Sequence, residues 1–84
     1  MNIFSENLKL FEGKTVKVNV SHKIYGGQQL KIRNFQPLCS DDKVGFTVEG
    51  RELFLYSSEI ENVITNKNML QIVGNIQTIT IKEI

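Results

Sequence analysis

Apolar and polar residues alternate along most of this chain, and this alternation predicts β-strands. The stretch "KTVKVNV" places Val16, Val18 and Val20 on one face of a strand and polar residues on the other. The same pattern returns in "QLKIR", in "KVGFTVE" and in "IQTITIKEI". Because such strands are half-buried, each is expected to turn its apolar face toward a common core.

Turn residues separate these segments at regular intervals. Gly-Gly at 26–27, Glu49-Gly50 and Gly74-Asn75 are typical of tight turns between strands. Phe35 breaks the alternation, so we expect a strand to end just before it, and the stretch 36–42 is predicted to be a loop. The pattern predicts a mainly β fold, a small antiparallel barrel of about five or six strands that is partly open.

The first 13 residues follow a different period. Phe4, Leu8 and Phe11 are spaced to lie on one side of a helix, and Gly13 is placed to end it. A helix this short is marginal alone and has to dock on the sheet. We therefore expect one domain over residues 1–84, with a short N-terminal helical turn as its lead-in.

Length and composition restrict the class of protein further. An 84-residue chain has a small core and little room for an enclosed catalytic pocket. Its one cysteine, Cys39, has no intramolecular disulfide partner, which fits a reducing compartment. The sequence shows neither a membrane-spanning run of about 20 apolar residues nor a secretory signal pattern, so we expect a cytoplasmic protein. Its richness in Ile, Asn and Lys favours a bacterial or phage source.

Charge is unevenly distributed along a chain whose net charge is only +1. Residues 14–33 carry five Lys or Arg residues and no acid, whereas residues 41–61 carry six acids against Lys43 and Arg51. Two interpretations remain open at this point. Neighbouring strands of opposite charge pair across a sheet, or the two regions serve to bind a partner.

Catalytic and metal-binding patterns are weak. His22 and Cys39 are the single residues of their types, and no local signature joins them into a nucleophilic pair. Zinc sites need three or four such ligands. The pair Asp41 and Asp42 lacks the ligand spacing of a calcium loop and is better explained as turn chemistry. We therefore expect no enzyme activity, no metal and no cofactor.

The basic region offers a candidate nucleic-acid surface. Proteins that bind single strands use cations for the phosphates and aromatic faces for the bases. The residues that provide both here are Lys17, Lys23, Tyr25, Lys31 and Arg33. Binding of RNA or single-stranded DNA through residues 14–33 is the second of three hypotheses from the sequence.

The first hypothesis is recognition of a protein partner. In "RELFLY" apolar side chains lie on both faces, and the acidic "SSEIE" follows directly. Aromatic residues with a polar rim are typical of protein interfaces. The candidate partner surface consists of Arg51, Phe54, Tyr56 and Glu59. Such a module suits a regulator or inhibitor from a phage or mobile element, and a third hypothesis is a homo-oligomerising structural subunit.

The overall pattern resembles the small SH3-like and Sm-like barrels. In the Sm-like proteins a short helical segment leads into a glycine and a first alternating strand, as "GKTVKVNV" does here. The stretch "LFLYSSEIENVI" is similar to their late strand, polar turn and closing strand. The Asp, Asn and Arg-Gly of the Sm RNA-binding signature are absent, so the resemblance implies the fold class and neither that RNA site nor ring assembly.

Overall fold

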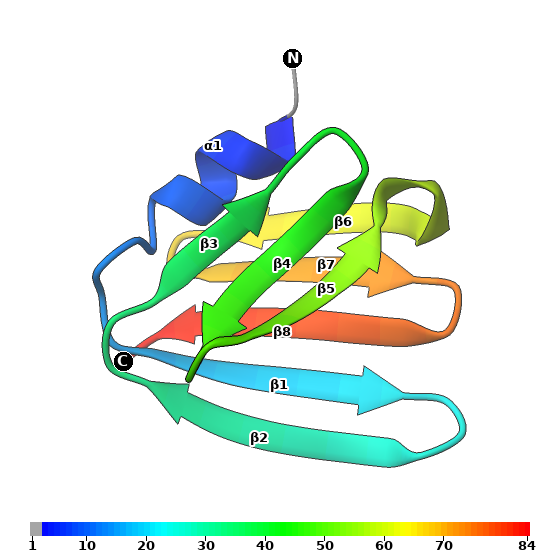
Figure 1. Ribbon diagram of the computed structural model, residues 1–84, viewed down its shortest axis with the longest axis horizontal. Helices are drawn as coiled ribbons and strands as arrows, with labels where there is room; N and C mark the ends of the chain where they lie inside the picture. The colour runs from blue at the N-terminus through cyan, green and yellow to red at the C-terminus, as the bar shows by residue number, and fades with distance from the viewer. Residues whose placement is uncertain (1–2) are drawn as a thin grey trace.

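Eight antiparallel strands form two sheets in the computed structural model, which describes the backbone of residues 3–84 and the side chains of residues 6–84 (Figure 1). The elements are α1 (Ile3–Lys9), β1 (Val16–His22), β2 (Gly26–Ile32), β3 (Gln36–Cys39), β4 (Lys43–Val48), β5 (Arg51–Tyr56), the 3-10 turn η1 (Ser57–Glu59), β6 (Ile60–Asn66), β7 (Met69–Gly74) and β8 (Gln77–Glu83). The mainly β, antiparallel prediction with a short N-terminal helix is confirmed. The number of strands is eight, more than the five or six expected.

The larger sheet has the strand order β2-β1-β8-β7-β6. Its centre is formed by β1 and β8, the first and the last strands of the chain, which pair antiparallel with Val16 opposite Glu83 and His22 opposite Gln77. This pairing places Val18 directly opposite Ile81, and both side chains face the core. The two ends of the chain are thereby joined within one sheet.

The smaller sheet has the order β3-β4-β5 and faces the larger one (Figure 1). Its first strand corrects the prediction of a loop over residues 36–42, because Gln36–Cys39 pairs with β4. Pro37 lies in this strand, opposite Phe46. Proline has no N–H to donate, and it is tolerated here because β3 is an edge strand with a partner on one side only.

One hydrophobic core fills the space between the sheets. Phe35, in the connection from β2 to β3, is fully buried and stacks on Phe46 of β4, with ring centroids 5.7 Å apart. Phe11 meets Phe35 edge to face at 6.4 Å. The alternating valines and isoleucines predicted from the sequence supply most of the remaining core, among them Val16, Val18, Val44, Ile72, Ile79 and Ile81.

The N-terminal segment contributes to this core as the helical spacing predicts. Leu8 is fully buried and Phe11 almost so, and α1 packs beside β3. Gly13 adopts a positive φ of 76°, which a glycine tolerates without strain and which lets the chain leave the helical segment toward β1. The predicted contribution of Phe4 falls on a side chain outside the described part of the chain.

The two sheets are not joined into a closed barrel by hydrogen bonds. The chain crosses between them twice, at residues 33–35 and at η1. Within residues 3–84 the edge strands β2, β6, β3 and β5 each have a partner on one side only, and β2 lies across from the β4–β5 hairpin. Within residues 3–84, no helix has the length and hydropathy needed to cross a membrane.

The fold predicts a strong effect of one added methyl group. A Cβ at Gly45 in β4 would overlap the carbonyl oxygen of Leu53 and the Cα of Phe54, whereas a Cβ at Gly27 would find its nearest neighbour at 3.8 Å. We expect Gly45→Ala to destabilise the protein by at least about 2 kcal/mol, which lowers the melting temperature by on the order of 10 °C.

Thermal unfolding followed by circular dichroism measures this difference. The matched variant Gly27→Ala is expected to melt close to the wild-type temperature. If Gly45→Ala melts there as well, the close approach of β4 and β5 is contradicted.

Candidate functional site

Three lysines form a straight row across the outer face of the larger sheet. The register of β1 places Lys17 directly opposite Lys31 of β2 and directly opposite Lys82 of β8. Residues at directly opposite positions lie on the same face of a sheet. Their neighbours Val16, Val18 and Ile81 are fully buried, so the lysines point away from the core.

Among the described side chains, no carboxylate forms an ion pair with a lysine of this row. Among residues 6–84 the single ion pair joins Lys14 and Glu83, whose Nζ and Oε1 atoms are 2.8 Å apart. Like charges directly opposite each other in a sheet are destabilising. The like charges of Lys31, Lys17 and Lys82 repel one another at these opposite positions, and an anionic ligand would reduce this repulsion.

The acidic region lies elsewhere in the molecule. Residues 41–61 form the smaller sheet, its turns, η1 and the start of β6, whereas the basic strands β1 and β2 pair with each other and with β8. The interpretation in which neighbouring strands of opposite charge pair across a sheet is therefore wrong. Most acids lie away from β1 and β2, although Glu61 and Glu83 belong to other strands of the larger sheet.

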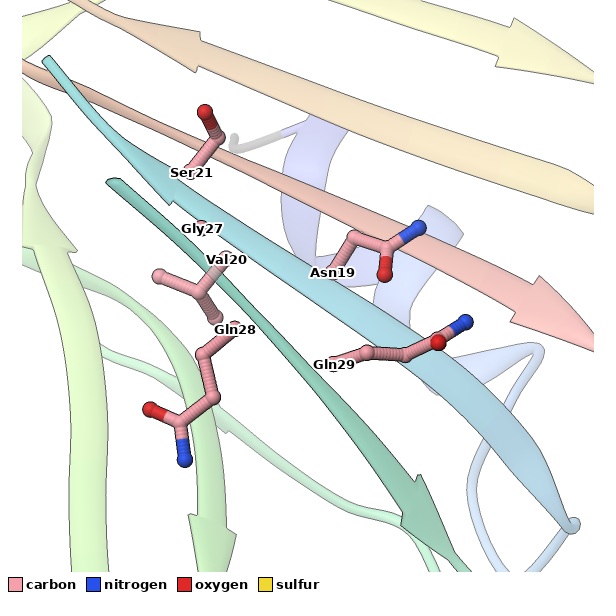
Figure 2. A pocket seen from close by; sticks show the side chains of 6 residues that line it. All are labelled: Asn19, Val20, Ser21, Gly27, Gln28 and Gln29. Atoms are coloured by element: carbon pink, nitrogen blue, oxygen red, sulfur yellow. The ribbon is translucent and has the colours of Figure 1, made fainter.

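Uncharged polar side chains continue the face beyond the lysine row. Two positions further along β1, a second row at directly opposite positions consists of Gln29, Asn19, Thr80 and Gln71. The side-chain amide of Gln71 donates a hydrogen bond to the hydroxyl of Thr80 at 3.2 Å. Figure 2 shows Asn19 and Gln29 pointing to the same side of the β1–β2 hairpin.

Beside these amides lies an open hollow of about 330 Å³. It is lined by Asn19, Ser21 and Gln29, together with residues 20, 27 and 28. The register places Ser21 opposite Gly27, so the missing side chain of Gly27 helps to leave room there. The hollow presents apolar surface together with uncharged hydrogen-bonding groups.

The β1–β2 hairpin ends in an exposed aromatic tip. Tyr25 is 85% exposed and lies against His22, with ring centroids 4.7 Å apart. The Nδ1 atom of His22 accepts hydrogen bonds from the backbone N–H groups of Ile24 and Tyr25 at 3.1 and 3.3 Å. Lys23 in the same turn anchors the tip, because its N–H donates to the carbonyl of Ile76.

The structure thus divides the candidate nucleic-acid residues between two ends of one hairpin. Lys17 and Lys31 are directly opposite, and Arg33 follows just beyond the end of β2. Tyr25 comes six residues before Lys31, which corresponds to about 20 Å along a strand. Lys23 lies with Tyr25 in the turn. The hollow lies between the two groups.

The candidate protein-partner residues lie on both faces of β5 and in η1. Tyr56 is 45% exposed and Phe54 half-buried on the outer face of the smaller sheet, where their rings meet edge to face at 5.3 Å. The Nζ atom of Lys43 lies 4.6 Å above the Phe54 ring. Arg51, opposite Val48, belongs to the inner face of the same strand, and Glu59 lies in η1.

One residue of the lysine row was missed from the sequence. Lys82 lies 65 positions beyond Lys17, and only the pairing of β1 with β8 brings them together. The signal available in the sequence was the alternation in "IQTITIKEI", which places Lys82 on the polar face of its strand.

Comparison with protein-family models, with curated proteins and with solved structures finds no significant match to this chain.

The unbalanced lysine row predicts a charge-reversal variant that is more stable than the natural protein. We expect Lys17→Glu to raise the stability by about 0.5–1 kcal/mol at low salt, because the new carboxylate on β1 would face Lys31 on one side and Lys82 on the other. The gain should shrink near 1 M salt, where screening acts within about 3 Å.

Chemical denaturation at the two salt concentrations measures this gain. Lys67→Glu in the β6–β7 turn changes the net charge equally and serves as the control. A Lys17→Glu protein that is no more stable than the control at low salt contradicts repulsion within the row.

Proposed function

We propose that this protein binds single-stranded nucleic acid along the outer face of β2, β1 and β8. The observation that carries the proposal is the row of Lys31, Lys17 and Lys82, which forms no ion pair with a carboxylate among the described side chains. A phosphate chain is the abundant ligand that supplies regularly spaced negative charge. The strands β2, β1 and β8 contain no acid apart from Glu83, which pairs with Lys14, and this supports the same ligand.

Each part of the face has a chemical role in this proposal. The lysine row and Arg33 hold phosphates, which gives affinity without sequence preference. The amides of Asn19 and Gln29 contact base edges or ribose hydroxyls, because amides both donate and accept hydrogen bonds. Tyr25 lies on His22, whose position in β1 is on the same face as Val18 and Val20, so its exposed ring would stack on a base where the bound strand passes over the tip. The separation of about 20 Å between tip and lysine row suits a strand of a few nucleotides.

Protein recognition, the first hypothesis from the sequence, has less support from the geometry. Its four residues lie on different surfaces, so they do not form one interface. The aromatic pair of Phe54 and Tyr56 with Lys43 above it keeps this function as a second candidate, because aromatic and cationic groups together are enriched at interfaces. Under both proposals the protein is a non-enzymatic binding module of a bacterial or phage cytoplasm.

The salt dependence of binding tests the nucleic-acid proposal. We expect a fluorescein-labelled mixed-sequence oligonucleotide to bind, and its affinity to fall steeply between about 50 and 200 mM salt. In the triple variant Lys17→Gln, Lys31→Gln, Lys82→Gln the affinity should fall strongly. The slope of log K against log salt should become shallower by about 2, since each lost phosphate contact removes about 0.7.

The matched control changes three lysines on other surfaces, in α1, β4 and the β6–β7 turn: Lys9→Gln, Lys43→Gln, Lys67→Gln. Both triple variants carry the same net charge. Absence of binding to wild-type protein at low salt, or an equal loss in the two triple variants, would rule out the proposed face.

Stacking at the tip gives an independent prediction. Tyr25→Leu should weaken oligonucleotide binding by about tenfold, because a base loses its aromatic platform. The salt slope should stay unchanged, since no phosphate contact is lost. Anisotropy titrations at several salt concentrations separate the two quantities. A Tyr25→Leu protein with wild-type affinity would show that the tip takes no part.

A further inference from the structure

A cleft of about 320 Å³ opens between the two sheets, where the edge of β2 faces the β4–β5 hairpin. One wall is β2, with Leu30 and Ile32, and the other is the end of the β4–β5 hairpin, with Val48 and Leu53. Its volume lies at the small end of the range for ligand pockets. It has room for one or two side chains rather than for a large cofactor.

The cleft exposes residues that the strand pattern assigns to the core. Leu53 lies on the inner face of β5, opposite Phe46, yet it is 37% exposed. Leu30 and Val48 are half-buried at the same place. The alternation in β5 places Leu53 on the core face, and Leu53 is nevertheless exposed because β2 ends the larger sheet before it covers this part of β5.

Both strands that border the cleft have an unpaired edge. In the described part of the chain β2 is hydrogen-bonded to β1 alone, and β5 to β4 alone. The edge of β2 is seven residues long and largely exposed. An unpaired edge beside an apolar pocket is the arrangement that receives an added strand from another protein.

We propose that this cleft binds an extended segment of a partner protein, which adds to the free edge of β2 and alternates apolar with acidic residues. The alternation follows from strand geometry. Leu30 and Ile32 face inward while Lys31 between them faces outward. Apolar residues of the added strand therefore enter the cleft, and the residues between them lie on the outer face beside Lys31.

Charge selects the acidic residues at these outward positions. Lys31 lies at one border of the cleft and Arg51 at the other, against one carboxylate, Glu49, in the turn. An acid opposite Lys31 would also balance the end of the lysine row. A basic strand would instead extend the repulsion. This inference shares Lys31 with the lysine row, whereas Leu53 and Arg51 take no part in that row, so variants of these two residues separate peptide binding from nucleic-acid binding.

The probe is a fluorescein-labelled seven-residue peptide of alternating Leu and Glu, matched in length to β2. We expect it to bind saturably at concentrations below about 1 mM, and to shift the backbone amide resonances of β2 and Leu53 in NMR spectra. A peptide in which Lys replaces Glu, and one of the same composition with the alternation broken, should bind at least about tenfold more weakly.

Variants of the two walls locate the site. Leu53→Glu and Arg51→Glu are each expected to weaken peptide binding by about tenfold or more. Tyr56→Glu, on the opposite face of the same strand, should leave it unchanged. Arg51 and Leu53 are both exposed, and native-like NMR spectra of the free variants verify their folding. The double variant Lys17→Gln, Lys82→Gln should retain peptide binding, which keeps this result separate from the nucleic-acid test.

Three results would overturn the inference. The first is no saturable binding of the Leu/Glu peptide, and the second is equal binding of all three peptides. The third is self-association of the wild-type protein, measured by light scattering, that Leu53→Glu or Arg51→Glu abolishes. In that case a second copy of the chain occupies the cleft.

Discussion

The pairing of β1 with β8 is the constraint on which the rest of the molecule depends. It joins the first strand of the chain to the last and makes β1 a central strand, so that Val16 and Val18 are fully buried. The same register determines the outer face, because it places Lys17 between Lys31 and Lys82. One long-range contact thus completes the core on one side of the sheet and concentrates charge on the other. The stability that the core contributes allows the repulsion among the lysines to persist.

The division into two sheets separates two kinds of surface. The outer face of β2, β1 and β8 is cationic and polar, whereas Asp41, Asp42, Glu49 and Glu52 lie in the smaller sheet and its turns. Between the sheets, the cleft where β2 faces the β4–β5 hairpin stays open and leaves Leu53 exposed. The cationic outer face suits a phosphate chain. The open cleft between the sheets suits an added strand that alternates apolar and acidic residues. Because β2 borders both, Lys31 is the residue at which binding of one ligand would influence the other.

Local patterns in the sequence predicted the strands and most of the core, since alternation reports directly which face of a strand is buried. They failed where the pairing or the exposure of a residue depends on contacts between distant parts of the chain. Pro37 suggested a loop, but an edge strand tolerates proline. The exposure of Leu53 depends on how far the opposite sheet extends, and Lys82 joins the site through a partner strand 65 positions away. The separation of Arg51 from Phe54 and Tyr56 was available from strand parity, because an odd spacing places residues on opposite faces.

The lysine row is either a ligand-binding face, as proposed, or only a solvated sheet surface. An NMR titration of the isotope-labelled protein with a short single-stranded oligonucleotide at low salt distinguishes the two. A ligand-binding face predicts amide and side-chain shifts at Lys31, Lys17, Lys82, Asn19 and Tyr25, with the strands of the smaller sheet unchanged. Shifts centred on β4 and β5, or none at all, would contradict it.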